Sequence, residues 1–178
     1  LLLKSLRSLG MQAEGYIPNR YEEGYGLHLE SLQQLQMNGA DLVVSVDCGV
    51  RAVEVAAWAQ SVGLDLIITD HHEPGPQLPD ALAVINPKQA DESYPFQELA
   101  AVGVAYKLAQ AISERLDREQ PTHLLDLVAL GTVADLVPMI SENRVLVVRG
   151  LEKINRSPLP GLLALMAGSG IQKGHVTA

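Results

Sequence analysis

Short, almost wholly apolar runs alternate with segments of helical periodicity through the first half of the chain. The runs DLVVSVDCG (41–49) and LDLIITD (64–70) are separated by VRAVEVAAWAQSVG, whose apolar residues recur at helical spacing. A third run, ALAVINP (81–87), follows a loop rich in proline and glycine. Strands that alternate with helices of about 10–15 residues form crossover units, and these produce a parallel sheet. The alternation therefore predicts an α/β fold in which a parallel β-sheet carries helices on both faces.

The remaining segments extend this pattern. The opening LLLKSLRSLG is typical of an amphipathic helix that ends at Gly10, and MQAEGYIP (11–18) predicts a short strand. From Leu99 onward the chain is helical in pattern, so we expect a helical C-terminal part. We expect residues 1–161 to form one domain and 162–178 to begin a linker to a further domain. Predicted helices cover 27–40, 50–63, 98–116, 122–137, 143–155 and 159–168.

Composition limits the classes of function. The chain has 178 residues, is 47% hydrophobic, and can bury a core as one domain with a small extension. A net charge of -8 argues against a surface wholly devoted to nucleic-acid phosphates, but it allows a local metal-lined groove. The single Cys48 excludes an internal disulfide and fits a reducing compartment. No apolar run approaches the roughly 18 residues that span a bilayer, so we expect a cytoplasmic protein without a membrane partner.

Two aspartates stand at the ends of the predicted strands. Asp47 ends VVSVD and Asp70 ends LIITD, and open parallel sheets bind ligands beyond the carboxyl ends of their strands. On neighbouring strands the two carboxylates would lie about 5 Å apart, where they repel unless a cation or proton separates them. His71 adds a nitrogen ligand. Carboxylates with imidazole suit Mn, Mg, Zn or Fe, so the pattern predicts a metal site.

Simpler interpretations of these residues remain open. Asp47 could cap the helix that follows it, and Asp70-His71-His72 could be a solvated polar loop. Because adjacent side chains of extended backbone point in opposite directions, the two histidines are not expected to serve one metal in the same manner. His28, among leucines on a predicted helix, favours a structural role.

Asp135 is a further candidate, because nearly every neighbour in LVALGTVADLVPM is apolar. A carboxylate buried there would have to be paired, capped or bound to metal. Thr132, three residues earlier, offers a capping box as the alternative. The segment is already helical in pattern from Leu124, however, and Pro138 leaves little helix to cap, which favours a site role.

The loop PNRYEEGYG is the last candidate. Gly24 and Gly26 flank Tyr25 and allow a close backbone approach, and Arg20 could clamp a phosphate with two hydrogen bonds. Glycine-rich loops between a strand and a helix are common, so the loop by itself indicates little.

Taken in order, these motifs resemble the DHH phosphoesterase superfamily, and within it the RecJ-type single-strand-specific exonucleases. The series is IPNRYEEGYGL, VVSVDCG, IITDHHEPG, AVINPK, LAAVGVAYKLAQAI and LVALGTVADLVPMISENRVLVVRGL. It covers the chain from about Gly10 to Gly161, and EGYGL and GVAYKL favour the exonucleases over the superfamily's pyrophosphatases and small phosphodiesterases. One departure is Ala101, where a glycine is expected.

The resemblance implies residue roles. Asp47 matches a metal-bridging aspartate, His71 a metal ligand, and Asp135 a late aspartate ligand. Asp70 matches a ligand or a residue that orients one, and His72 the histidine that faces the substrate phosphate. The substrate-side loop corresponds to Arg20, Gly24, Tyr25 and Gly26.

The resemblance also implies a function, namely 5′-to-3′ degradation of single-stranded DNA in repair and recombination. Two Mn²⁺ or Mg²⁺ ions about 3.5–4 Å apart would act on the scissile phosphate. Single-strand-binding protein and a helicase would be partners of the parent protein. The family's first motif, Asp-x-Asp-Gly, is absent, so we expect a fragment with an incomplete site and little activity of its own. The alternatives are an oligonucleotide or cyclic-dinucleotide phosphodiesterase, a pyrophosphatase, and a non-catalytic scaffold.

Overall fold

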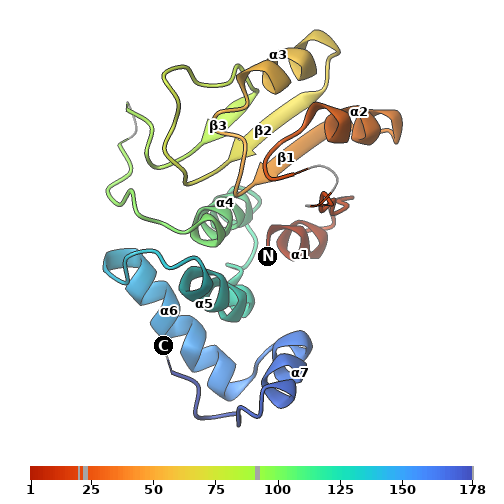
Figure 1. Cartoon of the computed structure of the whole chain (residues 1–178). Coiled ribbons are helices and arrows are strands. Elements are labelled where there is room, and N and C mark those ends of the chain that lie inside the picture. The colour runs from red at the N-terminus through yellow and green to blue at the C-terminus, as the bar shows by residue number, and fades with distance from the viewer. Residues whose placement is uncertain (20, 22–23, 91–92, 178) are drawn as a thin grey trace. The chain divides into compact units, whose positions relative to one another are not determined.

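The chain divides into two compact units in the computed structural model, which describes residues 1–19, 21, 24–90 and 93–177 (Figure 1). The sheet unit comprises Glu14–Gln97, and the helical unit comprises Leu1–Ala13 with Glu98–Ala178. The helical unit is thus discontinuous in sequence, with the sheet unit inserted between its two parts.

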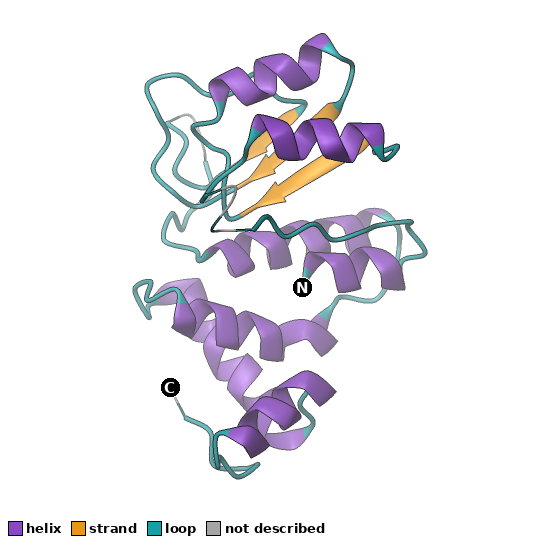
Figure 2. Ribbon diagram, turned by 45° about the vertical axis from the view of Figure 1, so that its right-hand side comes forward, coloured by secondary structure: helices purple, strands orange, loops and turns teal. Residues whose placement is uncertain are grey.

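The sheet unit contains three parallel strands, drawn in orange in Figure 2, and their order is β1-β2-β3. They are β1 Leu42–Val46, β2 Asp65–Thr69 and β3 Ala83–Ile85. Thr69 lies opposite Val46 on one side and Ile85 on the other, so the three strands end together at one edge. The predicted parallel sheet is confirmed, and the strands that carry Asp47 and Asp70 are neighbours.

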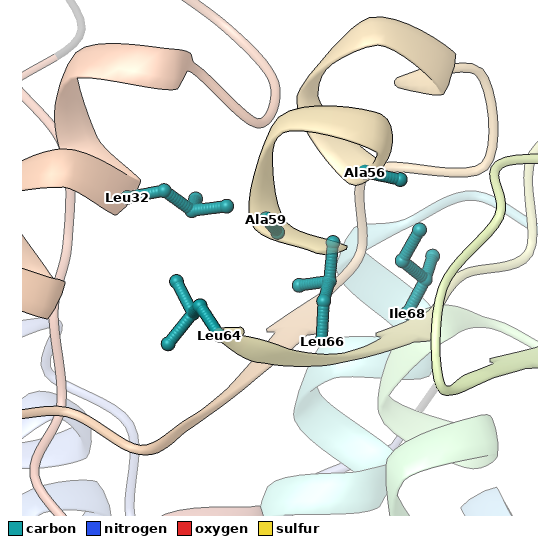
Figure 3. Packing of buried hydrophobic residues seen from close by; sticks show 6 residues of the cluster. All are labelled: Leu32, Ala56, Ala59, Leu64, Leu66 and Ile68. Carbon is teal, nitrogen blue, oxygen red and sulfur yellow. The ribbon is translucent and has the colours of Figure 1, made fainter. Parts of the chain in front are cut away.

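Two helices, α2 (Leu29–Met37) and α3 (Val53–Ser61), pack against the sheet through one shared core. Leu66 and Ile68 stand two residues apart on β2 and so project to the same side, towards α3 (Figure 3). On α3 the residues that meet them are alanines, which let the helix lie close to the strand. The buried members of this core are Leu32, Ala56, Ala59, Leu64, Leu66 and Ile68.

The strand predicted at residues 11–18 is wrong, because no strand forms there. An extended segment becomes a strand only when a neighbouring strand satisfies its backbone hydrogen bonds. Within the part of the chain that the structure describes, β1 pairs only with β2, so this segment is hydrogen-bonded to no strand of the sheet.

The helical unit confirms the predicted helical C-terminal part. Helix α1 contacts α4, and α5 packs against α6. At Gly150 of α6 any Cβ would overlap the carbonyl oxygen of Leu125 and the Cβ of Ala129, so α5 and α6 cross with almost no space between them. No helix in the described ranges is long and apolar enough to cross a membrane. The elements are α1 Leu2–Ser8, α4 Ala101–Arg115, the 3-10 turn η1 Thr122–Leu124, α5 Leu125–Ala134, α6 Ser141–Arg156 and α7 Pro160–Gly168.

Candidate metal centre

A polar residue follows each strand directly, at the carboxyl edge of the sheet. The backbone N–H of Asp47 donates to the carbonyl of Thr69 at 2.9 Å, and that of Asp70 donates to the carbonyl of Ile85 at 3.0 Å. Asn86 follows β3 at the same edge. The hydrogen-bond ladder therefore continues one residue beyond the strands and fixes where Asp47 and Asp70 emerge.

Asp47 occupies a strained turn. Its φ is 69°, in the left-handed region, which costs a residue other than glycine about 1–3 kcal/mol. The hydroxyl of Ser45 donates to the carbonyl of Cys48 at 2.9 Å and closes the turn. At Gly49 (φ 109°), a Cβ would lie 3.0 Å from Ser45 Oγ, so the turn requires glycine there. The N-cap of α3 is Ala52 and no side chain caps this helix, so the interpretation of Asp47 as its cap is wrong.

Asp47, His71 and His72 form a cluster of three ligand groups, with one ligand atom from each within 4.8 Å of the others. The Asp47 carboxylate lies 3.3 Å from His71 Nε2, and the two imidazole rings are 4.6 Å apart. The two imidazoles lie on the same side, because the chain bends at His72 after leaving β2 and the alternation of extended backbone no longer applies. That the two histidines serve a metal in different ways stays a prediction.

Asp70 is buried, with 1% of its surface exposed, and its carboxylate faces backbone donors. Oδ2 accepts the N–H of Val50 at 3.0 Å, while Oδ1 accepts the N–H of His71 at 2.8 Å and of His72 at 3.2 Å. Oδ1 also lies 2.6 Å from His72 Nδ1. The interpretation of Asp70-His71-His72 as a solvated loop does not fit this burial, and the contacts orient the two histidines.

These hydrogen bonds determine the charge of Asp70. Burial acts to raise the pKa of its carboxyl, but hydrogen bonds from Val50, from the His72 ring and from the backbone of His72 and His71 outweigh burial and lower the pKa. Because the folded pKa is below the unfolded one, the stabilisation is present above the unfolded pKa. It is lost as the pH falls through the folded pKa.

Asp70→Asn is expected to lower the free energy of unfolding by about 2–3 kcal/mol at pH 7, because an amide cannot accept all four hydrogen bonds as a carboxylate does. The deficit relative to wild type should shrink as the pH falls below the ordinary aspartate pKa of 3.8, because the stabilisation from the ionised carboxylate is then progressively lost. Urea unfolding across this pH range measures both the loss of stability at pH 7 and its change with pH. Asp41→Asn, at an exposed position, is the control, and a deficit that did not change with pH would contradict the charge assignment.

Sequence reasoning assigned no role to Asn86, although it stands in the quoted motif AVINPK. Its exposed fraction is 1%, and Nδ2 donates to the carbonyl of His72 at 2.8 Å while Oδ1 accepts the N–H of Lys88 at 2.8 Å. The signal for its role was its position at the carboxyl end of a strand, the same position that marked Asp47 and Asp70.

Cys48 lies beside the cluster but stays a thiol. Burial, followed by the negative charges of Asp70 and Asp47, raises the pKa of Cys48 to about 11. The ligand groups that lie together at this edge are those of Asp47, His71 and His72, which offer oxygen and nitrogen donors.

The glycine-rich loop approaches the cluster through Tyr25. Gly24 and Gly26 both have positive φ, and the Tyr25 hydroxyl donates to the carbonyl of Asp47 at 2.9 Å. Arg20 lies outside the described residues. His28 is half-buried directly before α2.

Asp135 belongs to the helical unit, where it is the C-cap of α5. Helix α5 runs through Thr132, so the capping-box alternative is wrong. The expectation of a buried carboxylate is also wrong for Asp135, which is exposed. The buried carboxylate of this helix is Asp126, whose exposed fraction is 0%, and which accepts the N–H of Leu159 at 2.8 Å.

The family assignment follows from the comparison with known proteins. The sequence profile of the "DHH family, N-terminal domain" matches residues 1–132. The chain belongs to the DHH family. The match contains Asp47, Asp70, His71 and His72, so the candidate metal centre lies within the DHH domain.

Relatives of this DHH chain are exonucleases of the RecJ type. It is 48% identical over 170 residues to the single-stranded-DNA-specific exonuclease RecJ of Bacillus subtilis (strain 168), covering 96% of this chain and 21% of that protein. RecJ of Escherichia coli (strain K12) is 42% identical over 180 residues, covering 93% and 31%. The crystal structure of exonuclease RecJ bound to manganese has a TM-score of 0.82 at 36% identity, covering 95% of this chain and 43% of that one. The chain therefore spans about a fifth to a third of these curated relatives.

Proposed function

We propose that the protein carrying this DHH chain is a divalent-metal-dependent exonuclease that degrades single-stranded DNA from its 5′ end in repair and recombination. The observation that carries the proposal is the cluster of Asp47, His71 and His72 at the carboxyl edge of a parallel sheet, in a chain similar to RecJ exonucleases. Within the proposal, the DHH domain extends over residues 1–161.

The donor set fits the proposed metal. One carboxylate and two imidazoles with ligand atoms within 4.8 Å suit Mn²⁺, and carboxylate oxygen also suits Mg²⁺. We assign Asp47 and His71 as ligands and Asp135 as a further ligand. Asp70, with both oxygens engaged by N–H groups, is assigned to orienting the histidines. When bound, such cations activate water and neutralise charge on the phosphodiester.

The substrate side is assigned to His72 and the loop. His72 is 46% exposed at its side chain and is held at Nδ1 by Asp70, and its exposed ring is assigned to contact with a phosphate oxygen. Arg20, Gly24, Tyr25 and Gly26 are assigned to contacts with the DNA strand. Single-strand-binding protein and a helicase as partners, and the cytoplasm as the location, belong to the same proposal.

The test uses the intact protein with single strands labelled at either the 5′ or the 3′ end, and with matched blunt duplex. With Mn²⁺ we expect mononucleotides to leave the 5′ end of single strands and the duplex to remain. Removal of the metal with a chelator should stop the release, and added Mn²⁺ should restore it.

Three results would overturn the proposal. Release that persists in chelator would remove the metal centre from the reaction. Hydrolysis of cyclic dinucleotides, short oligonucleotides or pyrophosphate, with single strands untouched, would assign the protein to another branch of the superfamily. Metal binding without any hydrolysis would make it a scaffold.

A further inference from the structure

Tyr25 is exposed, yet its hydroxyl group contacts other residues of the protein. The side chain is 63% exposed, while the hydroxyl donates to the carbonyl of Asp47 at 2.9 Å and lies 3.4 Å from His72 Nε2. The Tyr25 and His72 rings meet edge to face, with centroids 6.2 Å apart. One hydroxyl therefore contacts two of the three residues of the candidate metal centre.

The contact with Asp47 acts on a strained peptide. Asp47 has a φ of 69°, and this conformation directs its carboxylate to within 3.3 Å of His71 Nε2. The carbonyl that Tyr25 engages belongs to the same residue. A hydrogen bond to that carbonyl opposes rotation of the peptide and so helps to keep the carboxylate in place.

The contact with His72 completes the orientation of its ring. An ionised carboxylate only accepts hydrogen bonds, so His72 Nδ1, at 2.6 Å from Asp70 Oδ1, carries a hydrogen and donates it. The opposite nitrogen, Nε2, faces the Tyr25 hydroxyl. Asp70 holds the imidazole at Nδ1 and the Tyr25 side chain packs edge to face against its other end, so the two together restrict rotation of the ring.

We propose that Tyr25 is a positioning residue, whose hydroxyl holds Asp47 and His72 in the geometry of the metal centre and fastens the glycine-rich loop to it. The inference rests on the proposed metal site. It gives Tyr25 a role that a substrate contact alone would not require, because the hydroxyl engages the protein and only the ring faces outward.

Tyr25→Phe removes the hydroxyl and keeps the ring. Tyr21→Phe is the matched control, because Tyr21 lies in the same loop segment and is 99% exposed. The first measurement is made on this chain without metal, by following the ring-nitrogen NMR signals of the histidines. We expect the chemical shift of His72 Nε2 to differ from wild type in Tyr25→Phe and to match wild type in Tyr21→Phe. The melting temperatures of both variants should equal that of wild type.

The second measurement is Mn²⁺ binding to the same chain by calorimetry, where Tyr25→Phe should bind about five- to tenfold more weakly than wild type. In the intact protein, kcat for single strands should fall by a similar factor while KM stays within twofold. A raised KM with unchanged His72 signals and Mn²⁺ affinity would overturn the inference and make Tyr25 a substrate contact only. Because the NMR signals need no metal and no turnover, they decide the inference even if the nuclease assay fails.

Discussion

Asp47→Asn is expected to slow metal-dependent hydrolysis of single strands by the intact protein about a thousandfold or more. Asparagine matches the shape of aspartate and is among the few residues that tolerate a φ of 69°, so the turn after β1 should persist. What disappears is the negative charge that faces His71 Nε2 at 3.3 Å. The loss should therefore fall on metal binding and turnover and leave folding intact.

The rate of 5′ nucleotide release, measured over a series of Mn²⁺ concentrations, gives the size of the effect. Asp65→Asn is the matched control, since Asp65 is an exposed aspartate at the opposite end of the same sheet. Melting temperatures of both variants should match wild type. If Asp47→Asn released nucleotides as fast as Asp65→Asn, Asp47 would not be a metal ligand.

Among substitutions that add one methyl group in the helical unit, Gly150→Ala is expected to lower the stability most. The added Cβ would overlap the carbonyl oxygen of Leu125 and the Cβ of Ala129, and both lie on α5, which cannot retreat without disturbing its own core contacts. Overpacking of this kind costs about 3 kcal/mol. For a chain of this size that corresponds to a fall in melting temperature of roughly 6–12 °C.

Gly161→Ala provides the comparison, because a Cβ at Gly161 of α7 meets nothing within 4 Å. Alanine is also the better helix former, by up to about 1 kcal/mol, so this variant should be neutral or slightly stabilised. Urea unfolding monitored by circular dichroism measures both. Equal midpoints for the two variants would show that α5 and α6 are not in close contact at Gly150.

The sequence predicted those features that follow from local periodicity. Apolar runs separated by helical segments indicated parallel strands, and parallel strands bring their carboxyl ends to one edge, so the neighbouring positions of Asp47 and Asp70 followed. The direction of the Asp70 carboxylate did not follow, because its donor at Val50 lies twenty residues away in the chain. The links from Tyr25 to Asp47 and from Asn86 to His72 are likewise long-range and leave no periodic signal.

The errors have equally physical causes. The strand expected at 11–18 depends on a neighbouring strand, which no local pattern supplies. On α5, apolar neighbours led to the expectation that Asp135 is buried, whereas the buried carboxylate is Asp126. Asp126 and Asp135 are nine residues apart (135 − 126), about two and a half helical turns, so they face opposite sides of the helix. Only one of them could enter the core.

The insertion of the sheet unit between α1 and α4 also sets an order of events during synthesis. Residues 14–97 are contiguous, so all the strands and helices of the sheet unit leave the ribosome together. Helix α1 is made earlier, yet its partner α4 begins only at Ala101. At 5–20 residues per second that interval lasts roughly 5–20 s, during which Leu2 has no helix to pack against. Helix α1 therefore reaches its packing against α4 only after the whole sheet unit has been synthesised.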